Sequence, residues 1–128
     1  MKKILILLLL FFSILLVGCS VKESGKYTTF LSVSNTKKDS FSMSYEKFDG
    51  YKTYTIKAEK DDNLHMTFTT EGGSIDCSIV DSNGNTVYQL SDVGDLDNTI
   101  VLRLSGQYKI TLTAHSHKGS FEFKWGKQ

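Results

Sequence analysis

The sequence predicts an all-β fold, an antiparallel β-sandwich or jelly roll of about eight or nine short strands. From residue 41 onward, apolar and polar side chains alternate with a period of two, which is typical of strands that bury one face. Residues that favour turns separate these runs at intervals of about 8–12 residues. No segment beyond residue 18 repeats its apolar residues at a helical spacing over three turns. An open barrel is the second architecture that these patterns allow.

The predicted strands follow one another along the chain. Residues 26–34 also alternate, but their many hydroxyl side chains predict an edge strand or an extended linker. The later predicted strands are residues 41–46, 53–58, 64–69, 75–79, 86–90, 99–104, 108–114 and 121–125. The predicted turns and loops between them are Asp49-Gly50, residues 59–63, Gly72-Gly73, residues 81–85, residues 91–97, Ser105-Gly106 and residues 115–119. Phe121, Phe123 and Trp125 share one face of the last strand, so we expect them in the core.

The amino-terminal segment has the pattern of a secretion signal. Lys2 and Lys3 supply positive charge, and residues 4–17 are apolar except for Ser13. This run is shorter than the roughly 20 residues that span a bilayer. An ordinary secretory signal with an incidental cysteine, or an uncleaved anchor, would also fit these features.

Leu16, Val17, Gly18 and Cys19 close the apolar run, and together they resemble the lipobox of bacterial lipoproteins. The resemblance implies that the Cys19 thiol carries a diacylglyceryl group and that the signal is cut before it. Two or more acyl chains anchor a protein durably without a transmembrane helix. We therefore expect the protein on the extracytoplasmic face of the cell membrane, attached through lipid on Cys19.

This interpretation divides the chain into three parts. Residues 1–18 form the cleaved signal peptide, residues 19–36 form the lipidated amino terminus with a tether or edge strand, and residues 37–128 form the β-sandwich domain. The polar residues 20–25 are the expected tether. The part that remains after cleavage has the length of one domain.

The charge of the mature chain is nearly balanced. Loss of Lys2 and Lys3 from 15 basic residues leaves 13, against 14 acidic residues. This balance argues against nucleic acid as a partner and against a polybasic membrane patch. Lysine supplies every basic side chain except Arg103, a bias compatible with a low-GC Gram-positive source.

The two cysteines have different expected roles. If Cys19 carries lipid, Cys77 has no disulfide partner. Cys77 lies on the same parity as Ile75 and Ile79, so we expect a buried and inert thiol.

Several patterns in the sequence resemble metal-binding sites but also have simpler interpretations. Residues 81–85 contain Gly84 at the wrong position for a helical calcium loop, and they predict a hairpin turn with Gly84 at positive φ. Asp92, Asp95 and Asp97 are a better calcium candidate, although solvated loop charges also explain them. For His115 and His117 we expect a polar turn rather than a metal site. No cofactor and no metal is expected.

Three later segments resemble the bacterial pre-peptidase C-terminal β-sandwich domains. They are residues 75–84, which end in Asp81-Ser82-Asn83-Gly84, residues 106–112, which begin Gly106-Gln107-Tyr108, and residues 119–123. The similarity extends over residues 51–125. It implies a binding-type sandwich, and no peptidase accompanies the domain here.

The sequence favours a non-catalytic binding or interaction module for a cell-envelope ligand, such as a cell-wall glycan, a peptide or a protein. The alternatives are a protective, immunity-type lipoprotein or a transporter-accessory lipoprotein, and then a hydrolase, for which no catalytic motif is present. Sugar rings could stack on aromatic side chains. The candidates are Tyr45, Tyr51, Tyr54, Tyr88 and Trp125.

Overall fold

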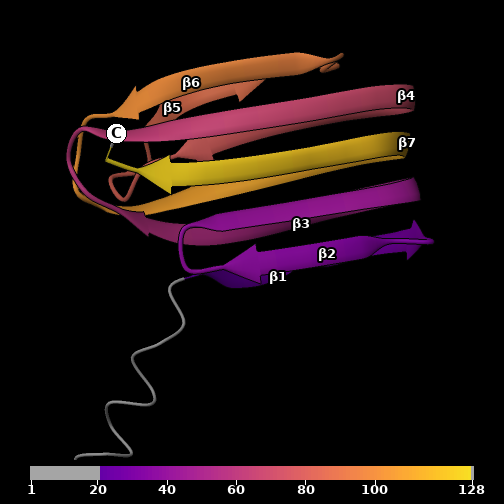
Figure 1. The fold of residues 1–128 in the computed structure, drawn as a ribbon, viewed down its shortest axis with the longest axis horizontal. Helices are drawn as coiled ribbons and strands as arrows, with labels where there is room; N and C mark the ends of the chain where they lie inside the picture. The colour runs from indigo at the N-terminus through magenta and orange to yellow at the C-terminus, as the bar shows by residue number, and fades with distance from the viewer. Residues whose placement is uncertain (1–20, 128) are drawn as a thin grey trace, which may run out of the picture.

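The computed structural model describes residues 21–127, which form seven antiparallel strands and no helix. The strands are β1 (Lys22–Phe30), β2 (Val33–Lys37), β3 (Ser40–Ala58), β4 (Asp62–Val80), β5 (Thr86–Leu90), β6 (Leu96–Leu102) and β7 (Gly106–Gly126). Figure 1 shows β3, β7 and β4 side by side in the middle of the sheet. The predicted all-β class is confirmed. Within these residues there is no apolar helix of bilayer-spanning length.

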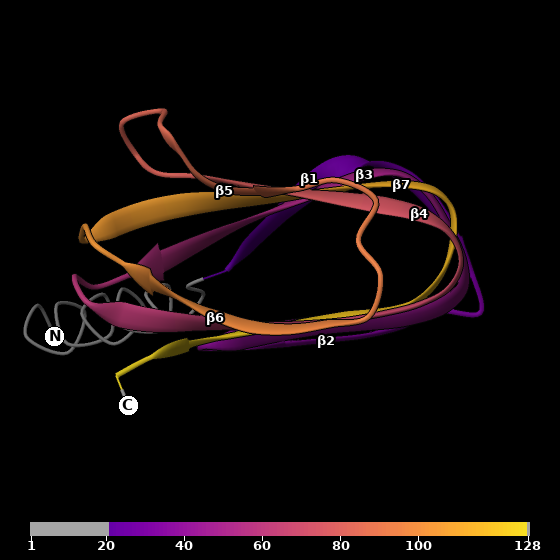
Figure 2. The same ribbon diagram turned by 90° about the horizontal axis from the view of Figure 1, so that it is seen from above.

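The sheet is folded over on itself into two layers, as Figure 2 shows. The strand order is β1-β3-β7-β4-β5, with β2 paired to β3 and β6 paired to β4. The three long strands run through both layers, so each contributes one half to either side of the sandwich. β1 and β5 complete one layer, and β2 and β6 complete the other. We call the end where the long strands change layer the bend end, and the opposite end the open end.

The number of strands differs from the prediction, for a physical reason. Asp49-Gly50, Gly72-Gly73 and residues 115–119 were expected to reverse the chain, but they lie where β3, β4 and β7 bend. The strand pairing shifts register at these points and then continues. A bulge lets a strand change direction without ending. The structure therefore has three strands of 19, 19 and 21 residues where the sequence predicted short strand pairs.

Two glycines allow the backbones to meet at the bend end. A Cβ on Gly119 would lie 1.9 Å from the carbonyl oxygen of Thr69, and one on Gly73 would lie 2.0 Å from that of Ser116. Both glycines have positive φ, 152° and 68°. Only glycine combines this conformation with such close approach.

The core lies between the two layers and follows the predicted alternation. The Phe41 ring from one layer stacks on Tyr54 from the other, with ring centroids 3.7 Å apart. Phe41 also stacks on Phe123, at 4.9 Å. Phe121, Phe123 and Trp125 are all buried, which confirms the prediction for the last strand. Aromatic contacts across the core thus join the two layers.

Residues 22–37 belong to the sheet as its edge strands. Lys22 already pairs with Thr55, so β1 begins inside the polar segment that was expected to be a tether. The ammonium group of Lys52 is nearly buried and lies 3.0 Å from the Glu23 carboxylate. It also sits 5.0 Å from the centroid of the Tyr27 ring. These contacts, together with backbone pairing, attach β1 to β3.

Candidate functional site

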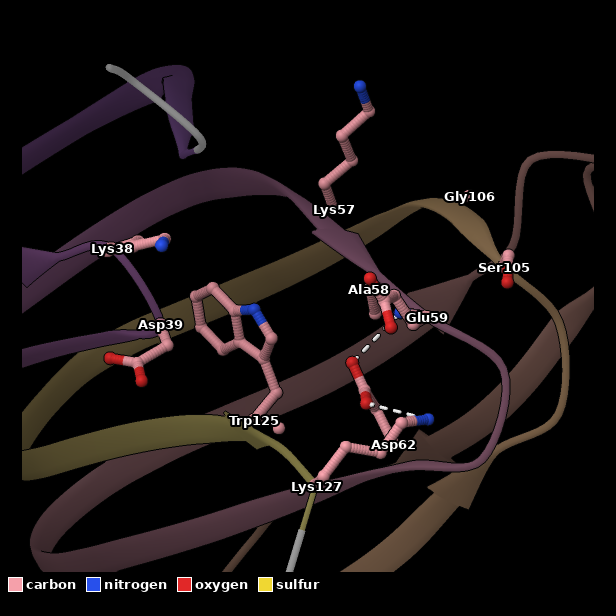
Figure 3. A pocket seen from close by; sticks show the side chains of 11 residues that line it. Lys38, Asp39, Lys57, Ala58, Glu59, Asp62, Ser105, Gly106, Trp125 and Lys127 are labelled. Atoms are coloured by element: carbon pink, nitrogen blue, oxygen red, sulfur yellow. Dashed lines mark hydrogen bonds and ion pairs between the residues drawn. The ribbon is translucent and has the colours of Figure 1, made fainter. Parts of the chain in front are cut away.

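A pocket of about 630 Å³ opens between the layers at the open end of the sandwich (Figure 3). Its walls come from the end of β3, the start of β4, both ends of β7 and the turn between β2 and β3. The lining residues are Lys38, Asp39, Lys57, Ala58, Glu59, Asp62, Ser105, Gly106, Trp125, Gly126 and Lys127. The pocket therefore forms where separate strand ends meet.

Trp125 is the aromatic wall of this pocket. Its side chain is buried, with 8% exposed, and its ring lies 6.0 Å from that of Phe41. The backbone N–H of Trp125 donates to the carbonyl oxygen of Asp39 over 3.0 Å, which joins β7 to the β2–β3 turn. Every fully buried side-chain nitrogen and oxygen in residues 21–127 has a hydrogen-bond partner. Figure 3 shows the indole ring among the side chains that line the pocket.

The lining contains positive and negative side chains in equal numbers. It includes three lysines, Lys38, Lys57 and Lys127, and three carboxylates, those of Asp39, Glu59 and Asp62. Figure 3 shows the Lys57 side chain pointing away from Trp125. Such a pocket has no strong net field to attract a polyanion or a polycation.

One carboxylate of the pocket is engaged within the wall. Asp62 is buried, and its Oδ2 accepts from the backbone N–H of Glu59 over 2.9 Å. Its Oδ1 lies 3.3 Å from Nζ of Lys127, which also donates to the carbonyl oxygen of Lys60. The Asp62–Lys127 pair thus shapes the wall, whereas the Asp39 and Glu59 side chains are exposed at the rim.

A second polar cluster lies at the bend end and is built around His117. Its Nδ1 is 2.6 Å from the Tyr45 hydroxyl, and its Nε2 is 2.8 Å from the Thr70 hydroxyl. The Thr70 hydroxyl donates its one proton to the carbonyl oxygen of Val93, so it must accept from Nε2–H. Nδ1 is then the acceptor for Tyr45. The network holds a neutral imidazole with both nitrogens satisfied.

Burial of this cluster shifts the pKa values of its side chains. It also shows that the prediction for His117 was wrong. Burial lowers the pKa of His117 below its ordinary value and raises the pKa of Tyr45 above its own. His117 was expected in a polar turn, but its side chain is fully buried. The alternation missed it because a bulged strand changes which parity points inward. His115 is exposed, but it too lies within β7 rather than in a turn.

The acidic loop does not assemble a metal site. Asp95 accepts from the backbone N–H of Thr70 over 3.0 Å, while Asp97 lies 2.9 Å from Nε2 of His65. Across residues 21–127, no three His, Cys, Asp or Glu side chains are placed to hold a metal ion. The carboxylates of Asp95 and Asp97 instead have separate partners, and the backbone N–H of Asp92 donates to Asp76.

The turn at residues 81–85 has the predicted conformation. Asp81 Oδ1 accepts from the backbone N–H groups of Asn83 and Asn85, at 2.9 and 3.0 Å. Gly84 has φ of 82°, so the prediction of a hairpin turn with Gly84 at positive φ is confirmed.

Cys77 and the aromatic candidates are mostly internal. Cys77 is 1% exposed, and burial raises the pKa of its thiol to about 12. This confirms the prediction of a buried thiol. Tyr45, Tyr54 and Trp125 are buried, while Tyr51 is 44% exposed. The five aromatic candidates therefore do not form one exposed platform.

The lipobox residues Leu16, Val17, Gly18 and Cys19 lie outside the described residues. Lipid attachment at Cys19 stays a prediction.

The charged residues of the pocket were not predicted from the sequence. Their only signal in the sequence is that they occupy turns and strand ends, and pairing far along the chain brings them together.

Comparisons with known proteins identify no family for this chain. It matches no protein-family model, and no curated protein matches it. The resemblance to pre-peptidase C-terminal domains thus stays a prediction.

Several solved structures are similar in fold. PliG, a periplasmic inhibitor of g-type lysozyme from Aeromonas hydrophila, is 10% identical, with coverage of 86% of this chain and 90% of its own, and a TM-score of 0.47. The carbohydrate-binding module TmCBM61, solved with β-1,4-galactotriose, is 16% identical, with coverage of 84% and 88% and a TM-score of 0.44. A carbohydrate-binding module of Cellvibrio mixtus lichenase 5A, solved with cellotriose, is 11% identical, with coverage of 81% and 86% and a TM-score of 0.39. These values are too low to indicate a ligand for this chain.

Proposed function

We propose that this protein is a lipid-anchored, extracytoplasmic binding module that holds a saccharide of the cell envelope without transforming it. The observation that carries this proposal is the pocket at the open end, which has Trp125 in its wall and charged side chains in its lining. Its volume lies in the usual range for small-ligand sites, roughly 300–1,000 Å³.

The chemistry of the pocket supports a saccharide as ligand. A sugar presents several hydroxyl groups, which both donate and accept hydrogen bonds, beside apolar C–H groups. The pocket offers acceptors on the exposed carboxylates of Asp39 and Glu59 and an apolar surface on Trp125. Its balanced charge favours an uncharged or zwitterionic ligand over a polyanion.

The amino-terminal sequence supports the location. The apolar run of residues 4–17 and the following Gly18-Cys19 have the lipobox pattern, and two acyl chains would keep the protein on the membrane. Together these features support a binding module on the extracytoplasmic face.

Intrinsic fluorescence tests the pocket directly, because Trp125 is the single tryptophan of the chain. The full-length protein in detergent micelles is titrated with soluble disaccharides prepared from cell-envelope glycans. We expect a saturable change in Trp125 emission. Glu59→Gln and Asp39→Asn should weaken the apparent affinity by roughly tenfold, as expected for loss of about 1.4 kcal/mol.

Glu71→Gln is the matched control, because Glu71 is an exposed glutamate on β4 outside the pocket. It should bind as the unmodified protein does. The proposal is wrong if no saccharide changes the emission saturably, or if Glu71→Gln weakens binding as much as the pocket variants.

The anchor has a separate test. Cys19→Ala should abolish incorporation of labelled fatty acid and leave the protein either uncleaved or released from the membrane. A variant that still carries labelled lipid and remains cleaved in the membrane would show that Cys19 is not the anchoring residue.

A further inference from the structure

β1 starts near the open end of the sandwich, as Figure 2 shows. The residues that line the pocket lie at the same end. Lys22, the first residue of β1, pairs with Thr55 of β3. Two residues beyond Thr55 on the same strand, Lys57 lines the pocket. A strand advances about 3.3 Å per residue, so the chain enters the sheet within roughly 10 Å of the pocket rim.

Covalent geometry keeps the proposed anchor near this point. Cys19 precedes Val21 by two residues, and Val21 packs against the core. Two residues span at most about 7 Å, whatever their conformation. A lipid on Cys19 would therefore leave the protein within roughly 20 Å of the pocket.

The length of β3 places the bend end far from the anchor. The half of β3 from Gly50 to Ala58 pairs continuously with β7, and its length is about 26 Å. Phe30, Leu31 and Val33, which are 61%, 70% and 70% exposed, lie where β1 and β2 meet the bend of β3. A short attachment at the open end holds the pocket close to the bilayer and leaves this apolar tip distant.

We infer that the saccharide taken by the pocket is the headgroup of a membrane amphiphile, a glycolipid or lipid-linked saccharide, in the same bilayer that holds the protein. This inference rests on the proposed anchor and pocket. Headgroups stand at the depth where the open end would lie, whereas a wall polymer would have to enter between the protein and the bilayer. Sharing one surface also raises the effective concentration of the headgroup, to about the millimolar range for short tethers.

The orientation is tested with fluorophores on two variants of the full-length lipoprotein, Lys57→Cys at the pocket rim and Leu31→Cys at the tip. Cys77 is buried and does not compete for the label. The variants are reconstituted in phosphatidylglycerol vesicles that contain a lipid with a quencher on its headgroup. We expect strong quenching of the Lys57→Cys label and little of the Leu31→Cys label. Combination with Cys19→Ala should remove the quenching. Equal or stronger quenching of the Leu31→Cys label would overturn the inference, because the apolar tip would then lie on the membrane.

The source of the ligand is tested with one disaccharide in two forms. Trp125 emission is measured with the anchored protein in phosphatidylglycerol vesicles, with a diglycosyl diacylglycerol added to the bilayer or its free disaccharide added to the solution. We expect saturation by the glycolipid at a total concentration at least tenfold below that of the free sugar. Glu59→Gln should weaken the response to the glycolipid, and Glu71→Gln should not.

The failures of the two proposals are distinguishable. Binding of the free disaccharide without any response to the glycolipid would overturn the inference and leave the saccharide function intact. No response to either form would overturn both.

Discussion

The Tyr45 hydroxyl donates to Nδ1 of His117 over 2.6 Å, and this bond joins β3 to β7 where both strands bend. The Thr70 hydroxyl of β4 accepts a hydrogen bond from Nε2–H of the same imidazole. All three long strands thus meet in one buried polar network at the bend end. A buried network of this kind stabilises one arrangement of the strands, because any slip leaves polar atoms without partners.

The stability of the domain should depend on protonation of His117. Burial lowers its pKa in the folded protein, while the unfolded chain keeps the ordinary value of about 6.5. Below that pH the unfolded state binds the proton more readily, so the free energy of unfolding decreases as pH falls from 7.5 to 5. The decrease approaches about 1.4 kcal/mol per pH unit between the two pKa values. Denaturant titrations at several pH values measure it.

Matched histidine variants separate this effect from other titrations. His117→Gln should lose about 1–3 kcal/mol of stability at pH 7.5 and should also lose this part of the pH dependence. His115→Gln alters an exposed histidine and should keep the dependence. An unchanged pH profile in His117→Gln would show that another group is responsible.

Gly119→Ala should destabilise the bend severely. The new Cβ would lie 1.9 Å from the Thr69 carbonyl oxygen, at φ of 152°, so we expect a loss of roughly 3 kcal/mol or more in the free energy of unfolding. Gly94→Ala is the control, since a Cβ there has no atom within 4 Å. Equal melting temperatures of the two variants would contradict the close approach of β4 and β7.

Gly84→Val tests the hairpin turn between β4 and β5. The site is open, without an atom within 4 Å of a new Cβ, but φ is 82°. The cost should therefore come from the backbone alone, about 1 kcal/mol or more for a β-branched residue. Gly84→Asn should cost less, because asparagine tolerates positive φ. Thermal unfolding of both variants compares the two costs, and an equal cost would exclude a backbone origin.

Trp125→Ala removes a buried side chain from the core as well as the aromatic wall of the pocket. We expect a loss of about 3–5 kcal/mol in the free energy of unfolding. In the unmodified protein, Trp125 emission should be blue-shifted and only weakly quenched by iodide, because 8% of the residue is exposed. Emission at the position found in water, with efficient quenching, would place the indole outside the core.

Cys77 should resist thiol reagents until the domain unfolds. The side chain is 1% exposed, and burial raises the pKa of the thiol to about 12, so little thiolate is present near pH 8. The rate of modification in increasing denaturant should follow the unfolding of the domain measured by Trp125 fluorescence. Rapid modification of the native protein would contradict the burial of β4.

The alternation of side chains determined most of the core. Phe41, Met43, Phe121, Phe123 and Trp125 are buried as their parity predicts, because strands place successive side chains on opposite faces. The turn at Gly84 could also be predicted from the sequence, because turns with positive φ favour Gly, Asn and Asp. These features depend only on neighbours in the chain.

The sequence by itself thus determined the all-β class, the buried face of most strands and the pattern that predicts lipid on Cys19. The tertiary structure decided that Gly50, Gly73 and Gly119 lie at bends rather than at the ends of strands, because only pairing with β4 and β7 keeps the chain extended through them. It also decided the burial of His117 and the assembly of the pocket. Asp39, Glu59 and Trp125 are far apart in the sequence and share one site only because strand ends from both layers meet there. Local sequence patterns reflect the backbone conformation of neighbouring residues. Contacts between residues far apart in the sequence form only when the sheet folds over.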